Sequence, residues 1–235
     1  MVLMSVRELA RVGVPVVNWA EFLSRFRWRQ GEHVSLIGHT SCGKSTLGVE
    51  LLPRRRRRVV LATKPRDPLI TDLVKKRGYY LSKKWPAPRG EDQVVLWPPI
   101  TRLGDTASQS HAFGSALARI YRTGGWCVYA DEVRYLTQTL GLSRALSQFW
   151  LQGRTLGISL MVATQEPTHI PLEAYSQATH LFLWRASDKR RINRLGEIGG
   201  VNTDVIKHVV QNLPLHDVLY VNTRDDAMCV TNVRS

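Results

Sequence analysis

The stretch Val34-Ser35-Leu36-Ile37-Gly38-His39-Thr40-Ser41-Cys42-Gly43-Lys44-Ser45-Thr46 decides the fold. Its apolar start predicts a buried strand, the segment 38–46 a glycine-rich loop, and the apolar residues 47–52 a helix. The spacing G-x-x-x-x-G-K-S lets the backbone N–H groups of the loop point inward at a phosphate, because glycine permits positive φ angles and close approach. The stretch therefore predicts a phosphate-binding loop between a strand and a helix.

The loop also predicts how a nucleotide would be held. Residues 38–46 would surround a polyphosphate above the helix N-terminus, whose dipole favours an anion. Lys44 would reach the β- and γ-phosphates, and the Ser45 hydroxyl would ligate Mg²⁺. A nucleotide and Mg²⁺ are therefore the expected cofactors.

Length and composition favour one domain. With 235 residues and 43% hydrophobic content, the chain is expected to hold an N-terminal arm and helix over residues 1–30 and one domain over residues 31–235. The three cysteines have no paired or metal-ligand spacing, which favours a reducing, cytoplasmic compartment. No apolar run approaches the roughly 20 residues that span a bilayer, and no signal peptide is recognised. We expect no membrane association.

The charge balance points to a polyanionic partner. The chain has 33 Lys and Arg against 19 Asp and Glu, a net charge of +14, which favours nucleic acid. Five consecutive arginines, Arg54 to Arg58, would repel one another, so they favour either DNA phosphate contact or a solvated turn. Residues 64–104 are less regular and mix basic with aromatic residues, which suits a nucleic-acid surface or a basic loop with aromatics packed inward.

A second chemical element ends the apolar run 126–130 with two carboxylates, Asp131 and Glu132. In a protein with a phosphate loop, Asp131 is the expected partner of the Mg²⁺ held by Ser45, and Glu132 can polarise the attacking water. The apolar run 158–164 likewise ends at Gln165, which could hydrogen-bond the γ-phosphate or the water. Because ligands bind outside the carboxyl ends of parallel strands, we expect Gly38, Asp131 and Gln165 to converge.

The remaining pattern alternates strands and helices, which predicts an α/β fold. Asn18 and Glu21 predict a capping box for a helix with Trp19, Phe22, Leu23 and Phe26 on one face. The other expected helices are 106–122, with Ala112, Ala116, Leu117 and Ile120 inside, 142–156 and 187–197. The other expected strands are 59–63, 93–97, 179–184, 217–222 and 228–232.

The residues 153–158 (GRTLGI), running into 163–167 (ATQEP), make the sequence resemble the FtsK/HerA superfamily of ring-forming DNA motors. The later run 178–185 (ATHLFLWR) looks like the next strand of that family. The resemblance implies a RecA-like P-loop ATPase with a mainly parallel central sheet flanked by helices. It also implies that Arg154, eleven residues before Gln165, reaches into the nucleotide site of a neighbouring subunit, with Arg185 as second choice.

The length leaves room neither for the N-terminal β-barrel of HerA-type proteins nor for the membrane segments and winged helix of full-length FtsK proteins. The chain is therefore similar to small viral genome-packaging ATPases and to FtsK-like proteins of phages and plasmids. The resemblance implies a hexameric ring that uses ATP and Mg²⁺ to translocate double-stranded DNA without sequence preference. In the packaging setting it works in the host cytoplasm and docks on a capsid portal or vertex protein.

Three alternatives remain open at this point. Within the motor class, the chain could be a conjugation or chromosome-partition translocase. From other classes, it could be a P-loop phosphotransferase, which would need a lid and a self-contained site, or a nucleotide-switched DNA-binding protein without translocation. The position of Gln165 argues against the phosphotransferase.

Overall fold

A computed structural model describes residues 9, 12–100, 102, 104, 106–165, 168, 170–195, 197–198 and 201–233. Its centre is a nine-stranded sheet with the strand order β3-β4-β2-β5-β6-β1-β7-β8-β9. The seven strands from β3 to β7 in this order are parallel, and β8 and β9 are added antiparallel at one side. The predicted α/β class and mainly parallel sheet are confirmed.

The strands are β1 (His33–Ile37), β2 (Arg58–Leu61), β3 (Tyr80–Ser82), β4 (Gln93–Leu96), β5 (Cys127–Ala130), β6 (Ser159–Thr164), β7 (Ala178–Trp184), β8 (Val218–Asn222) and β9 (Ala227–Thr231). The α-helices are α2 (Trp19–Arg25), α3 (Lys44–Leu51), α4 (Pro68–Arg77), α5 (Ala107–Thr123), α6 (Ser143–Gln152), α7 (Glu173–Ser176), α8 (Lys189–Leu195) and α9 (Thr203–Asn212). A short 3₁₀ turn, η1 (Leu52–Arg54), follows α3, and a π-helical turn, η2 (Tyr135–Thr139), follows β5.

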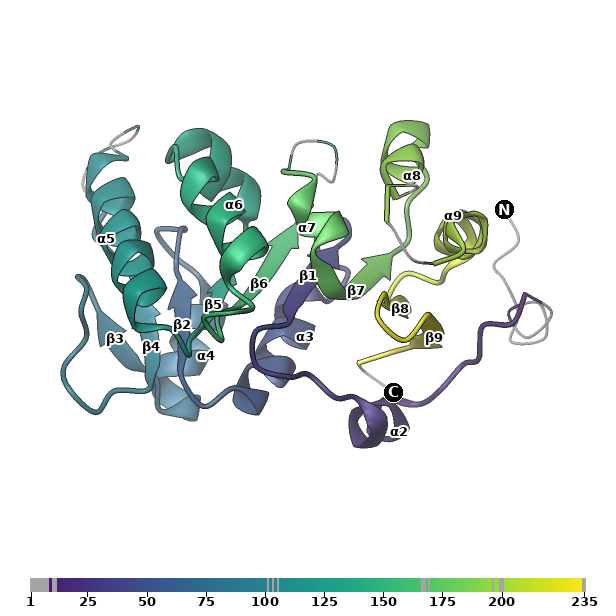
Figure 1. The fold of residues 1–235 in the computed structure, drawn as a ribbon, viewed down its shortest axis with the longest axis horizontal. Coiled ribbons are helices and arrows are strands. Elements are labelled where there is room, and N and C mark those ends of the chain that lie inside the picture. The colour runs from purple at the N-terminus through teal and green to yellow at the C-terminus, as the bar shows by residue number, and fades with distance from the viewer. Residues whose placement is uncertain are drawn as a thin grey trace.

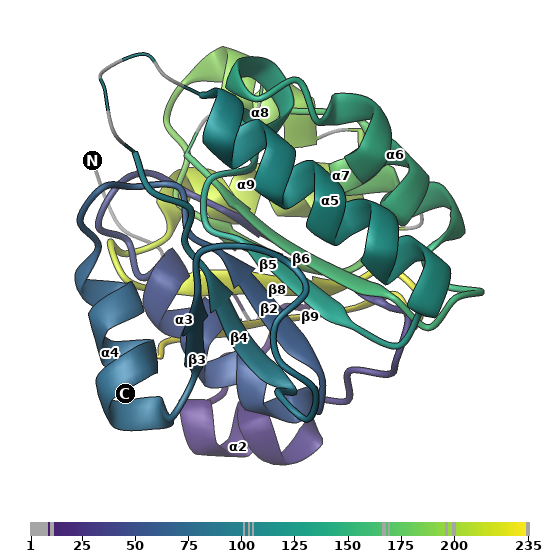
Figure 2. The same ribbon diagram turned by 90° about the vertical axis from the view of Figure 1, so that its left-hand side faces the viewer.

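Helices cover both faces of the sheet (Figures 1 and 2). One apolar cluster joins the sheet to α5, α6, α7 and α9, and a second joins the opposite face to α2, α3 and α4. The central strands are therefore buried on both sides, which explains why they read as continuous apolar runs in the sequence. Every residue of β1, β5 and β6 is buried.

The N-terminal segment is fastened to the sheet by aromatic residues. Asn18 caps α2, with its side chain accepting from the Glu21 N–H at 2.8 Å, as predicted. The Glu21 carboxylate does not complete the predicted box but pairs with Arg25 at 2.9 Å. Phe22 packs edge-on against Phe182 of β7, at 5.8 Å between ring centroids. The described part of the arm joins β9, where the Val17 N–H donates to the Val230 carbonyl at 2.9 Å.

Several predicted elements need correction. Residues 64–104 are more regular than expected, because they contain α4 and β3, and α9 was not foreseen. In α5, Phe113 rather than Ala112 lies in the buried stripe. The helix expected over 142–156 ends at Gln152, so Arg154 lies in the turn before β6. Residues 1–8, 166 and 167, on which some of the predictions fall, lie outside the described residues.

Because β1 to β7 are parallel, their carboxyl ends meet at one edge of the sheet, which we call the carboxyl edge, and their starts form the amino edge. The phosphate loop follows β1, Asp131 and Glu132 follow β5, and Gln165 follows β6. These strands are neighbours in the order β5-β6-β1. The strand order therefore brings the phosphate loop, Asp131 and Gln165 to the same edge of the sheet, as predicted. Among the described residues, no helix is both long enough and apolar enough to cross a bilayer.

Candidate nucleotide-binding site

The phosphate loop joins the end of β1 to the start of α3 in a conformation that its glycines permit. Gly43 is the N-cap of α3 with a φ angle of 114°, a left-handed value that an L side chain would strain. At Gly38, a Cβ atom would lie 2.7 Å from the Trp184 Cβ and 2.8 Å from the Cys42 Sγ. Both glycines of the motif are therefore required, one by backbone conformation and the other by space.

Lys44 points back into the loop. Its ammonium group donates to the carbonyls of Gly38 and His39, both at 2.6 Å, and the residue is 7% exposed. Burial lowers the pKa of Lys44, and the nearby Cys42, Asp131 and Glu132 counteract part of that effect. A cation held inside the loop can contact a phosphate that the loop surrounds.

Asp131 is the most connected side chain of the site. Its Oδ1 accepts from the hydroxyls of Ser45 and Tyr129, both at 2.8 Å, and its Oδ2 accepts from the Lys64 ammonium at 2.7 Å. Burial alone would raise the pKa of Asp131, but hydrogen bonds from these three partners and the charge of Lys64 hold it below its ordinary value. Asp131 is therefore ionised at neutral pH.

The pair Ser45 and Asp131 fits Mg²⁺. Hydroxyl and carboxylate oxygens are the ligands that Mg²⁺ prefers, and this ion is usually bound by one or two carboxylates together with substrate phosphates. The contact of 2.8 Å between the two side chains brings both oxygens to one place beside the loop. Among the described residues, no group of three His, Cys, Asp or Glu side chains forms an independent metal site.

Glu132 lies beside Asp131 in a different environment. Its Oε1 is buried and has no hydrogen-bond partner within the described structure. Burial raises the pKa of Glu132, and the neighbouring charge of Asp131 adds to that effect. Two adjacent carboxylates thus have pKa values shifted in opposite directions, which is the pattern expected of a metal ligand beside a proton acceptor.

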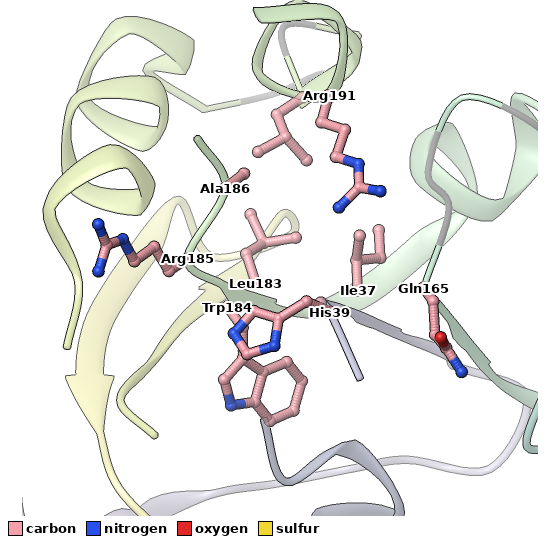
Figure 3. A pocket seen from close by; sticks show the side chains of 10 residues that line it. Ile37, His39, Gln165, Leu183, Trp184, Arg185, Ala186 and Arg191 are labelled. Carbon is pink, nitrogen blue, oxygen red and sulfur yellow. The ribbon is translucent and has the colours of Figure 1, made fainter. Parts of the chain in front are cut away.

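Gln165 lies where the cavities of the carboxyl edge meet. Its Oε1 accepts from the Thr40 hydroxyl of the phosphate loop at 2.6 Å. A cavity of about 350 Å³ on one side contains Lys44, Ser45, Lys64 and Asp131, and one of about 450 Å³ on the other contains Glu132. A third, small pocket also includes Gln165 (Figure 3). The glutamine therefore joins the phosphate loop to the cavity of the second acid.

The two candidate arginines lie at opposite edges. Arg154 is exposed at the amino edge, before β6, whereas Gln165 follows that strand. Six strand residues at about 3.3 Å each separate them by about 20 Å, so Arg154 cannot serve its own subunit's site. Arg185 follows β7 at the carboxyl edge and extends away from the other side chains labelled in Figure 3.

Sequence reasoning missed Lys64 and Tyr129. Lys64 follows β2, the strand that pairs with β5, so it is one more polar residue just beyond a strand of the carboxyl edge. The same rule that selected Asp131 and Gln165 would have found it. Tyr129 lies on β5 two residues before Asp131, on the same side of the strand, and its hydroxyl reaches the same carboxylate. Because Tyr129 lies within the apolar run 126–130, its hydroxyl did not stand out in the sequence.

The arginine run belongs to the amino edge and has protein partners. Arg55 is 8% exposed and donates to the Trp28 carbonyl and Gln30. Four of the five guanidinium groups lie over aromatic rings, in the pairs Arg54 with Phe26, Arg55 with Trp28, Arg57 with Trp126, and Arg58 with Tyr79. Only Arg56 has a side chain that is 90% exposed. Neither DNA contact nor a solvated turn describes Arg55, because it is buried.

Comparisons with known proteins agree with this fold. The sequence matches no protein-family model and no curated protein. The genome packaging NTPase B204 from Sulfolobus turreted icosahedral virus 2, in complex with sulfate, is 14% identical, with 87% of this chain and 98% of that chain covered and a TM-score of 0.67. The same NTPase in complex with ATP-gammaS is 13% identical, with 86% of this chain and 98% of that chain covered and a TM-score of 0.62.

Another similar structure comes from a different organism. Thermomonospora curvata EccC (ATPases 2 and 3), in complex with a signal sequence peptide, is 14% identical, with 97% of this chain and 42% of that chain covered and a TM-score of 0.58. The chain therefore shares the RecA-like α/β fold of these NTPase structures, and the fold that the resemblance implied is confirmed.

Proposed function

We propose that this protein is an ATPase that assembles into a ring, a hexamer by resemblance, and uses hydrolysis to translocate double-stranded DNA. The observation that carries the proposal is the contact of 2.8 Å between Ser45 and Asp131, because it joins the phosphate loop to the strand end that bears Glu132. Gln165, hydrogen-bonded to Thr40, completes the same edge. We further propose genome packaging as the setting, with a capsid portal or vertex protein as docking partner.

Each group in the site has a role in hydrolysis. The loop N–H groups and Lys44 bind the polyphosphate, and Ser45 and Asp131 hold Mg²⁺, which neutralises charge on the phosphates. Glu132 orients the attacking water and accepts its proton, a role for which a raised pKa suits a carboxylate at neutral pH. Gln165 senses the terminal phosphate through its bond to Thr40.

The polymer substrate is inferred from charge and likeness. A net charge of +14 favours a polyanion, and a sequence-independent motor binds DNA through phosphates. The viral packaging NTPase B204 is matched over 98% of its chain, which supports the packaging setting. Arg154 would complete the site of the adjacent subunit, because it is exposed and too far from its own.

The test is hydrolysis of ATP with and without duplex DNA. We expect DNA of any sequence to raise the rate, and affinity for DNA to fall about 10³- to 10⁵-fold between roughly 50 and 200 mM salt if about six to ten phosphates are contacted. Glu132→Gln should retain MgATP binding and lower the rate by about 10²- to 10⁴-fold. Native turnover by this variant would remove Glu132 as the base, and turnover that ignores DNA would contradict translocation.

A further inference from the structure

A buried glutamine lies behind the two acids of the site. Gln109, in the first turn of α5, is fully buried, at 0% exposure. A buried amide is costly unless its polar atoms are hydrogen-bonded. The Gln109 Nε2 donates to the Thr63 carbonyl at 3.1 Å, and its Oε1 accepts from the Tyr135 hydroxyl at 2.7 Å. The residue thus connects the segments that follow β2 and β5.

Both of those segments carry groups of the site. Thr63 directly precedes Lys64, whose ammonium binds the Asp131 Oδ2 at 2.7 Å. Tyr135 begins the π-helical turn η2, three residues after Glu132. Hydrogen bonds and short stretches of chain therefore connect Asp131 to Lys64, Thr63 to Gln109, and Gln109 to Tyr135 of η2, which leads back to the acid pair.

The turn η2 follows Glu132 almost directly in the chain. Arg134, two residues after Glu132, is the N-cap of η2, so the backbone that carries the acid leads straight into the turn. A π-helical turn is rare and is frequently found at functional sites. Because Tyr135 is the first residue of η2, its bond to Gln109 holds the start of the turn, and with it the backbone segment on which Glu132 lies.

We propose that Gln109 and Tyr135 are positioning residues that hold Glu132 in the orientation needed to activate water. The inference rests on the proposed hydrolysis of ATP and adds two residues to it. Neither lines the cavity that contains Lys44, Ser45 and Asp131, although Tyr135 borders the neighbouring cavity of Glu132. Displacement of a catalytic group by about 1 Å can cost about 10²-fold in rate, so loss of either bond should act on turnover rather than on binding.

Two substitutions remove the link with little change of shape. Tyr135→Phe deletes one hydroxyl, and Gln109→Met keeps the side-chain length without the amide. The matched control is Tyr79→Phe, because the Tyr79 hydroxyl accepts from Arg58 at 2.6 Å at the amino edge, away from the site. Thermal midpoint, nucleotide Kd, kcat and KM would be measured for each variant and for the native protein.

We expect Tyr135→Phe and Gln109→Met each to lower kcat by about tenfold to 10²-fold without changing the nucleotide Kd. The double variant should be no slower than the worse single variant, because both changes break one link. Tyr79→Phe should lower the thermal midpoint and leave kcat unchanged. If Gln109→Met does not fold, Tyr135→Phe alone carries the test.

Native kcat in Tyr135→Phe, or an equal loss of kcat in Tyr79→Phe, would overturn the positioning role while leaving the proposed function intact. Absence of hydrolysis by the native protein would overturn the proposed function and this inference with it. The two failures are therefore distinguished in one set of measurements.

Discussion

The carboxyl and amino edges of the sheet use the same residue types for different purposes. Lys44 and Arg55 are buried to a similar degree, at 7% and 8% exposure. Lys44 lies in a loop that opens on a cavity shared with Asp131, whereas Arg55 packs over the Trp28 ring at 4.8 Å. The comparison teaches that a buried cation indicates a site when its neighbours border a cavity, and a structural contact when they are rings and carbonyls.

The amino edge also has a buried acid, and it is fully engaged. Glu32, at 3% exposure, accepts from His180 at 3.0 Å and from the Arg29 N–H at 2.7 Å, and it pairs with Arg224. Tyr220 contacts the other nitrogen of His180 at 2.9 Å. Glu132 at the opposite edge has a buried oxygen without a partner. The engaged acid stabilises the fold, and the unengaged one is available for chemistry.

Arg154 gives the strongest test of the contrast between a structural amino edge and a chemical carboxyl edge. It lies at the amino edge but is proposed to act at the carboxyl edge of a neighbouring subunit. An arginine that stabilises the charge on the transferred phosphoryl group contributes about 10³- to 10⁵-fold in rate. We expect Arg154→Ala to lose activity on that scale while nucleotide binding to single subunits is unchanged. Steady-state hydrolysis and nucleotide affinity of the same preparation measure both.

Mixed assemblies supply the control for Arg154. Rings that combine Arg154→Ala subunits with Glu132→Gln subunits contain interfaces where both groups are native. Hydrolysis should reappear in the mixture although each variant alone is inactive. Continued inactivity after proven subunit exchange would mean that the arginine acts within its own chain or that Arg185 has the role. The separation of about 20 Å between Arg154 and Gln165 of one chain argues against action of the arginine within its own chain.

The raised pKa of Glu132 gives a further test of its difference from Glu32. A base must be ionised to accept a proton, and burial raises the pKa of Glu132 above its ordinary value of 4.5. Hydrolysis should therefore fall as the pH falls through that raised pKa, by about tenfold per pH unit below it. A pH profile of kcat at saturating MgATP measures this. An acid limb at or below pH 4.5 would show that the base is another group.

The sequence predicted the residues whose positions are set locally. The phosphate loop and the pair Asp131 and Glu132 follow directly from their spacing after apolar strands, and the structure places them at one edge. Lys64 follows an apolar strand as Asp131 and Gln165 do, but its contact with Asp131, 67 residues away, depends on the pairing of β2 with β5. Gln109 escaped for the same reason, because its partners Thr63 and Tyr135 follow those two strands. Strand order cannot be read from periodicity.

In two regions the sequence interpretation missed contacts or elements, for related reasons. The arginine run looked unpaired because its aromatic partners lie far away in the sequence, including Trp126. Helix α4 was hidden by its basic residues, although Asp67 caps it and Pro68 stands at its first position, which is a recognisable start. Its buried face consists of only Ile70 and Leu73, too short a stripe to stand out.

Glu32→Gln tests whether the amino edge is purely structural. Burial would raise the pKa of Glu32, but His180, the Arg29 N–H and Arg224 together lower it from 4.5 to about 2. A depressed pKa contributes stability that is present above about pH 4.5 and lost as the pH falls toward 2. The variant should lose on the order of 3 kcal/mol at pH 7, and its difference from the native protein should shrink on acidification.

Urea unfolding across this pH range measures the effect of Glu32→Gln, with hydrolysis of the folded variant as the companion readout. At urea concentrations well below the unfolding midpoint, we expect the variant to have the native kcat. A stability difference that stays constant from pH 7 to pH 3 would mean that the carboxylate charge contributes nothing. A loss of kcat in fully folded protein would give the amino edge a part in the chemistry.

Arg56→Gln is expected to have the smallest effect. Its side chain is 90% exposed and its ion pair with Asp92, at 3.4 Å, is of the surface kind that contributes little. Stability should stay within about 0.5 kcal/mol of native. Because the other four arginines of the run are occupied by rings and carbonyls, Arg56 alone can distinguish a structural amino edge from a DNA-binding one. The salt dependence of DNA affinity should keep its native slope. A slope reduced by about 0.9, the value for one phosphate contact, would instead place DNA at this edge of the sheet.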